Sequence, residues 1–165
     1  MDLFFRMLMG HVMGDYILQP LIMAVKKSPR KPMKEATPEE RPEEAPAEDV
    51  EEKKDPYAVP VGTAIFWSIL HSLVYTTSVC LWLWTWRPLV FGLIFLTHWP
   101  IDFFSLGSKW LELIRGRTFA QAGADKTPFG PFNVGFTCLV YATVDNWWHI
   151  ALMTPVVWVL SKGLI

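Results

Sequence analysis

Four long apolar runs constrain this chain more than any other feature of its sequence. They cover residues 3–25, 60–84, 88–106 and 134–160. As a helix, each run is long enough to cross a hydrocarbon layer about 30 Å thick. The chain of 165 residues is 52% hydrophobic, with nine Trp and eleven Phe, which exceeds what one soluble core of this size needs to bury. The sequence therefore predicts an all-α fold, an integral membrane four-helix bundle that forms a single domain.

The segment after the first apolar run has a very different composition and is predicted to be a flexible linker. Residues 26–56 hold ten of the sixteen acidic and eight of the fifteen basic residues, with many Pro and few large apolar side chains. Such a segment buries too little surface to offset its ordering entropy. Binding of a cytoplasmic partner by this linker is the alternative interpretation. Because the basic charges are mixed with acidic ones, no basic face exists for a nucleic acid.

The connections between the runs predict how the chain crosses the membrane. Residues 109–117 mix apolar and basic side chains, which is typical of a short interfacial helix, and the Pro and Gly residues that follow predict a turn. The first and third connections hold eight and four Lys or Arg residues, whereas the N-terminus, the turn at Arg87 and the C-terminus hold one each. By the positive-inside rule, we expect a multi-pass protein of the inner (cytoplasmic) membrane with both termini outside.

Ionisable side chains interrupt every apolar run. All four histidines of the chain lie in the runs, and three of them have an aspartate four residues away. Residues four apart share one face of a helix, so each pair points in a single direction. At 1.5 Å per residue, all of these side chains fall in one layer, roughly 8 to 22 Å from the cytoplasmic ends. The seven residues are His11 and Asp15, His71, His98 and Asp102, and Asp145 and His149.

The cost of these side chains in a bilayer points to a shared function. An ionised Asp at the bilayer centre costs about 2.5 to 3.5 kcal/mol on insertion scales unless it is paired, protonated or metal-bound. Imidazole and carboxylate together suit Zn²⁺, Mn²⁺ or Fe²⁺. The sequence predicts a divalent-metal site, with His11, His98 and His149 as the main ligands. The three aspartates are expected to act as ligands, general bases or partners that orient the histidine rings.

Three functions are compatible with this polar set. The first is a metal-dependent membrane hydrolase, in which the metal activates water against an amphiphilic substrate. The second is a small oligomeric transporter, or conduit, for protons or metal ions, which needs several copies because four helices are few. The third is a non-catalytic adaptor, in which the polar residues only hold the helices together. Cys80 and Cys138 both lie in apolar runs, which argues against a disulfide and against a cysteine zinc site.

Four motifs of the chain resemble a known family. They are H-V-M-G-D-Y-I-L-Q-P near the N-terminus, L-H-S, H-W-P-I-D-F and D-N-W-W-H. Together they resemble the small polytopic bacterial and phage membrane proteins grouped as domain of unknown function 3307. The resemblance implies a polytopic architecture and a residue set, without an established activity. Asn146 stands where the family commonly has Gln, and the charged linker is longer than usual. The matching positions are His11, Gly14, Asp15, Gln19, His71, His98, Asp102, Asp145 and His149.

Overall fold

The computed structural model describes residues 2–30, 58–116 and 118–165, and these residues are mostly helical. The described residues contain no strand, and an isolated antiparallel bridge joins Arg30 to Val59. The predicted all-α class is therefore confirmed. From residue 31 onward, the predicted linker lies outside the described residues.

The first apolar run does not form the single helix predicted for residues 3–25. It forms helix α1 (Leu3–Val12), a π-helical turn η1 (Met13–Ile17) and helix α2 (Leu21–Lys26). Pro20 is extended, with φ −69° and ψ 155°, at the N-cap of α2. Proline has no N–H to continue a helix and disfavours helical backbone in the residue before it. The run is therefore broken where Pro20 stands.

The second and third runs form a pair of neighbouring helices, followed by a sharp bend. Helix α3 (Val61–Leu83) agrees with the prediction, and helix α4 (Pro88–Phe103) begins with Pro at a first-turn position that tolerates it. Helix α4 ends earlier than the predicted residue 106, because Ser105 adopts a left-handed backbone with φ 50°. Helix α5 (Leu106–Arg115) follows at an angle of 55° to α4.

The end of the chain is more helical than predicted. Helix α6 (Phe119–Ala124) was not predicted, and its first turn is stabilised by a capping box between Thr118 and Gln121. The turn predicted from the Pro and Gly residues that follow is present at residues 127–129. Helix α7 (Gly130–Ser161) has 32 residues and is about 48 Å long, starting before the predicted residue 134. The short helix predicted before the fourth run is present as α5.

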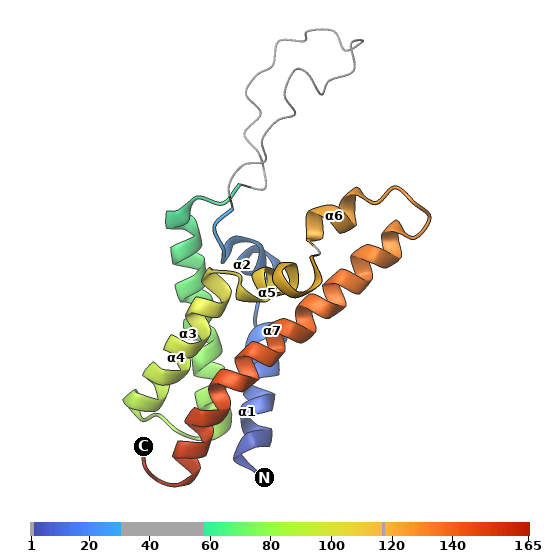
Figure 1. Cartoon of the computed structure of the whole chain (residues 1–165). Helices are drawn as coiled ribbons and strands as arrows, with labels where there is room; N and C mark the ends of the chain where they lie inside the picture. The colour runs from blue at the N-terminus through green and yellow to red at the C-terminus, as the bar shows by residue number, and fades with distance from the viewer. Residues whose placement is uncertain (1, 31–57, 117) are drawn as a thin grey trace, which may run out of the picture.

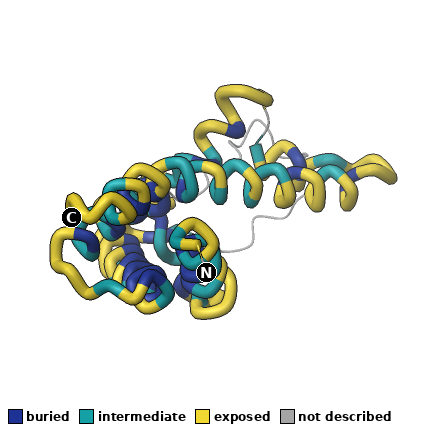
Figure 2. Tube along the Cα trace, turned by 90° about the horizontal axis from the view of Figure 1, so that it is seen from below, coloured by how far each residue is buried: buried dark blue, intermediate teal, exposed yellow. Residues whose placement is uncertain are grey.

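Helices α1, α3, α4 and α7 pack around one another. Contacts run from α1 to α3, from α3 to α4, from α4 to α7 and from α7 back to α1. The two termini lie at one end of this bundle, and α2, α5 and α6 lie at the other (Figure 1). Buried positions face the inside where the helices meet, and exposed ones face outward (Figure 2). The apolar core includes Met7, Tyr75, Val79, Ile94 and Met153.

The helices differ in how well they suit a membrane. Among the helices of the described residues, α3 is long and apolar enough to cross one, and α4 and α5 satisfy the same criterion only as a bent pair. Helix α1 has only 10 residues, and α7 includes Asp145, Asn146 and His149, which lower its hydropathy. One or two candidate spans are therefore present where the sequence predicted four.

Candidate metal centre

A close approach between η1 and α3 positions the first ligand. The N–H of Leu18 donates to the carbonyl of Met13 at 2.9 Å, the five-residue step that defines a π-turn. A Cβ at Gly14 would lie 2.8 Å from Cδ2 and 3.1 Å from Cα of Tyr75, so only glycine allows this packing without displacement. As a result, Asp15, the next residue, lies against the interior face of α3.

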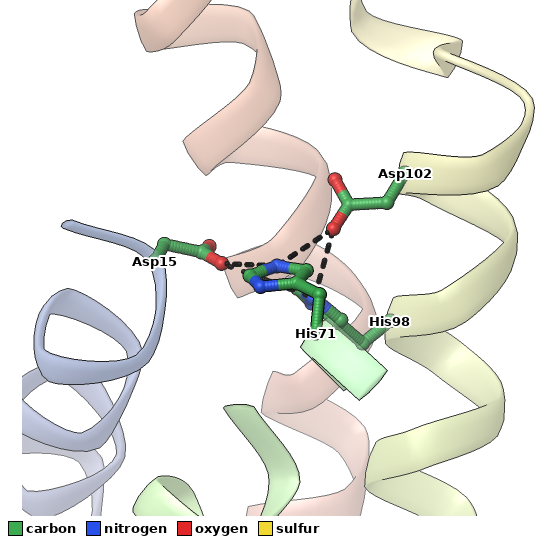
Figure 3. A group of neighbouring side chains, drawn as sticks. All are labelled: Asp15, His71, His98 and Asp102. Carbon is green, nitrogen blue, oxygen red and sulfur yellow. Dashed lines mark ion pairs between the residues drawn. The ribbon is translucent and has the colours of Figure 1, made fainter. Parts of the chain in front are cut away.

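Four side chains from three elements meet inside the bundle (Figure 3). They are Asp15 from η1, His71 from α3, and His98 and Asp102 from α4, and we call them the primary cluster. The Nε2 atom of His71 lies 3.2 Å from Oδ1 of Asp15 and 2.9 Å from Oδ2 of Asp102. The Nε2 atom of His98 lies 3.0 Å from the same Asp102 oxygen and 3.8 Å from Asp15. One ligand atom from each residue lies within 4.8 Å of all the others.

The primary cluster is buried, yet its atoms are poorly paired. The side chains of His71 and His98 are 0% exposed, that of Asp102 is 1% exposed and that of Asp15 is 9% exposed. Although these atoms are close, neither Nε2, nor Oδ1 of Asp15, nor Oδ2 of Asp102 makes a hydrogen bond of ordinary geometry. Buried polar atoms in native proteins almost always have such a partner, and lacking one costs about 1–3 kcal/mol. The arrangement can hold a metal ion at its centre.

His11 lies beside the primary cluster but has other partners. Its Nδ1 lies 2.9 Å from the hydroxyl of Tyr75, and its Nε2 contacts the amide oxygen of Asn146. The ring of Tyr75 also stacks on His98, with centroids 3.5 Å apart, which restricts the orientation of that imidazole. Of the three histidines predicted as main ligands, only His98 belongs to the primary cluster. His11 is not among its ligands, and His149 belongs to the second group described next. His71, which was not predicted as a main ligand, is at the centre of the primary cluster.

The remaining predicted residues form a second group that shares Asp102. The ligand atoms of Asp102, Asp145 and His149 also lie within 4.8 Å of one another. Nδ1 of His149 donates to the backbone carbonyl of Asp145 at 2.8 Å, which leaves Nε2 as the nitrogen able to bind a cation. That Nε2 is buried and has no hydrogen-bond partner. The rings of His98 and His149 are only 4.5 Å apart, so the two groups are adjacent.

Lys27 belongs to this centre, although the sequence placed it in the flexible linker. Its Nζ lies 2.8 Å from Oδ1 of Asp102, with 12% of the side chain exposed. Burial lowers the pKa of Lys27, but the carboxylates of Asp102 and Asp15 outweigh that effect and hold the pKa above its usual range. With its amide oriented to satisfy both neighbours, Gln19 presents its oxygen to Nζ at 3.1 Å. Lys27 directly follows α2, which contacts α3 and buries Met23.

Comparisons with protein-family models, curated proteins and solved structures found no match to this chain. The resemblance to domain of unknown function 3307 therefore stays a prediction made from the motifs.

A cavity of about 640 Å³ borders the centre. Asp15, Lys27 and Asp145 are on its wall, so the cavity reaches both groups of potential ligands. The rest of its wall, at the end of the bundle that carries α2 and α5, combines polar or charged side chains with Ala24, Phe119 and Ala142. These further polar residues are Tyr16, Gln19, Ser28, Arg30, Ser105, Ser108 and Tyr141. The cavity is large enough for a small-molecule headgroup.

Proposed function

We propose that this protein is a metal-dependent hydrolase of a membrane, acting on an amphiphilic substrate. A buried cluster of two imidazoles and two carboxylates supports the metal, because one ligand atom from each residue lies within 4.8 Å of all the others and their mutual contacts lack ordinary hydrogen-bond geometry. Two nitrogens and two oxygens, with a bound water as a further ligand, suit Zn²⁺, Mn²⁺ or Fe²⁺. The convergence of these four buried ligand atoms is the observation on which the proposal rests.

The charges of the centre favour a bound cation. Asp15 and Asp102 bring two carboxylates into the interior, and Lys27 is the cation paired with one of them. A buried charge without compensation is strongly unfavourable, since water cannot solvate it. Metal ligation requires neutral histidines, and a divalent cation between the two carboxylates would then supply the second positive charge.

A purely structural role accounts less well for the same contacts. Polar residues that hold helices together are expected to form complete hydrogen bonds, because a half-satisfied network is less stable than an apolar core. Tyr75 and Ser78 fit that role, since their hydroxyls bond Met153 and the Gly10 carbonyl at 3.1 and 3.0 Å. The primary cluster does not fit it, because its atoms are close without such bonds.

The residues around the cavity support hydrolysis over a simple cation store. A metal ion held by the primary cluster would lower the pKa of a bound water and so supply a nucleophile. Asp145 lies on the cavity wall beside the cluster, where it can accept the proton of that water. Lys27 is placed on the same wall to stabilise negative charge that develops on the substrate.

The surface of the bundle supports a membrane location and an amphiphilic substrate. Helix α3 meets the length and hydropathy of a span, and large apolar side chains such as Leu73, Leu81 and Leu96 are exposed on α3 and α4. On α5, the exposed Leu113 and Ile114 suit an interfacial helix. We propose that the α2 and α5 end faces the cytoplasm and that both termini lie outside, which places the polar cavity near headgroup depth.

Metal analysis of the full-length protein in detergent tests the proposal first. We expect about one or more equivalents of Zn, Mn or Fe after purification, and His71→Gln should lose most of it. Glu112→Gln is the matched control, because Glu112 is an exposed carboxylate on α5, away from the cluster. Failure of the wild-type protein to retain or take up any of the three metals would refute the proposal.

Reaction assays then separate hydrolysis from the alternatives. The metal-loaded protein should release p-nitrophenol from a long-chain p-nitrophenyl ester or phosphodiester. Asp145→Asn should lower the rate at least tenfold while the primary cluster still binds its metal ion. Movement of Zn²⁺ or protons across proteoliposomes without hydrolysis would favour the transport function. Stoichiometric metal with neither activity would leave a structural metal site in an adaptor.

A further inference from the structure

The centre holds more ligands than one cation requires. Four histidines and three aspartates converge inside the bundle, and the primary cluster uses four of these seven side chains. Hydrolytic metal sites use three or four protein ligands and keep a position for water, so the primary cluster alone supplies enough side chains for one ion. His11 is accounted for by Tyr75 and Asn146. Asp145 and His149 are thus left without a role as ligands of the first ion.

The leftover pair has the features of a second site. Together with Asp102, Asp145 and His149 offer three ligand atoms within 4.8 Å of one another. His149 is 1% exposed, and its Nε2 has no hydrogen-bond partner among the described residues. Its other nitrogen is held by the Asp145 carbonyl, an arrangement that fixes the tautomer in which Nε2 can bind a metal. A buried imidazole nitrogen with no partner is the independent sign of a ligand.

Asp102 links the two groups in a way that fits a pair of cations. Lys27 occupies Oδ1 of Asp102 at 2.8 Å, so Oδ2, which faces both His71 and His98, is the oxygen available to metal. One carboxylate that serves two ligand groups is the usual bridge of two-metal hydrolytic sites, whose ions lie about 3.5–4 Å apart. The ring centroids of His98 and His149, one from each group, are 4.5 Å apart, so the two ligand groups are adjacent.

We infer that this protein has a dinuclear centre, in which a second divalent cation is bound by Asp102, Asp145 and His149. The inference rests on the proposed function, because the primary cluster holds the first cation and Asp102 is shared. Three carboxylates and Lys27 leave two negative charges, so two divalent cations would leave a positive centre at the cavity wall. A positive centre favours a bound hydroxide and an anionic group of the substrate.

Titration of the metal-free, full-length protein in detergent with Mn²⁺ tests the second site. Bound metal is measured by equilibrium dialysis, and electron paramagnetic resonance reports whether two Mn²⁺ ions are coupled. The wild-type protein should bind two Mn²⁺ per chain and give an exchange-coupled spectrum. His149→Gln should bind one Mn²⁺ and give the six-line spectrum of an isolated ion, and Glu112→Gln should behave like the wild type.

The outcomes distinguish this inference from the proposal on which it rests. One Mn²⁺ per chain in the wild type, unchanged in His149→Gln, overturns the dinuclear centre and leaves the metal-dependent function standing. No bound Mn²⁺, together with no bound zinc or iron, overturns both. Asp145→Asn, at a partly exposed position on the cavity wall, provides a second variant in case His149→Gln fails to fold, and it too should lower the stoichiometry from two to one.

Discussion

Replacing Lys27 by Met tests how the buried negative charge of Asp102 is compensated. The two charges of the Lys27–Asp102 pair are 2.8 Å apart, and the Asp102 side chain is 1% exposed. At an effective dielectric constant of about 20, the gross attraction is about 6 kcal/mol, part of which offsets desolvation. Removing one partner of a buried pair typically costs about 3–5 kcal/mol. We expect Lys27→Met to lose stability of that order when no metal is bound.

Metal should change the size of this loss. In the variant, Asp102 has no lysine, so a bound cation provides the compensation that Lys27 gives in the wild type. The destabilisation should therefore shrink by at least about 1.4 kcal/mol when metal is added, and by linkage the variant should bind the metal about tenfold more tightly or better. Both effects follow because either Lys27 or a bound metal ion can compensate the negative charge of Asp102.

Thermal unfolding followed by tryptophan fluorescence measures the loss of stability with and without metal. Unfolding in detergent is recorded with EDTA and with saturating Zn²⁺ or Mn²⁺, and the metal dissociation constant is determined separately. Lys26→Met is the matched control, because Lys26 is the preceding residue and the described residues give it no ion pair. If Lys27→Met were as stable as the control in EDTA, or lost equal stability with and without metal, the assigned role of Lys27 would be wrong.

Three further predictions concern packing, ligand choice and pH. Gly14→Ala should destabilise the protein by about 1–3 kcal/mol in the same unfolding assay, because the added Cβ would lie 2.8 Å from Tyr75; an unchanged midpoint would contradict the packing of η1 on α3. His11→Gln should retain bound metal in dialysis, since both ring nitrogens of His11 have other partners; loss of all metal would instead make His11 a ligand. Metal occupancy should fall as pH drops below about 6.5, because protons compete for the imidazole nitrogens, and pH-independent binding down to pH 5 would argue against histidine ligands.

The pairs spaced four residues apart were the part of the centre that the sequence could predict well. His98 and Asp102 lie on one face of α4 and contact each other at 3.0 Å, as helical periodicity requires. His11 and Asp15 remain 3.2 Å apart even though η1 interrupts the helix between them. The cost of each polar face in lipid favoured one shared site, but periodicity does not contain the contacts that bring the faces of different helices together.

The choice among the histidines depended on contacts that no local pattern contains. His11 is held by Tyr75 and Asn146, which are 64 and 135 residues away in the sequence. The orientation of α3 about its axis places His71 at the centre of the primary cluster, although His71 has no Asp four residues away. Lys27 was missed for a similar reason, since the composition of residues 26–56 concealed that the first of them continue α2.

Departures from regular helix geometry explain how so many polar groups reach one point. The π-turn η1 contains Asp15, Pro100 lies inside α4 between His98 and Asp102, and the left-handed Ser105 ends that helix just beyond Asp102. Beside them, Ser28 donates to the Asp102 carbonyl at 2.6 Å, which satisfies a backbone group near the end of α4. Each departure weakens a helix locally, and all of them border the same centre. Irregular backbone in helical proteins gathers where function requires it, so the positions of these breaks are a further reason to place the chemistry at the primary cluster.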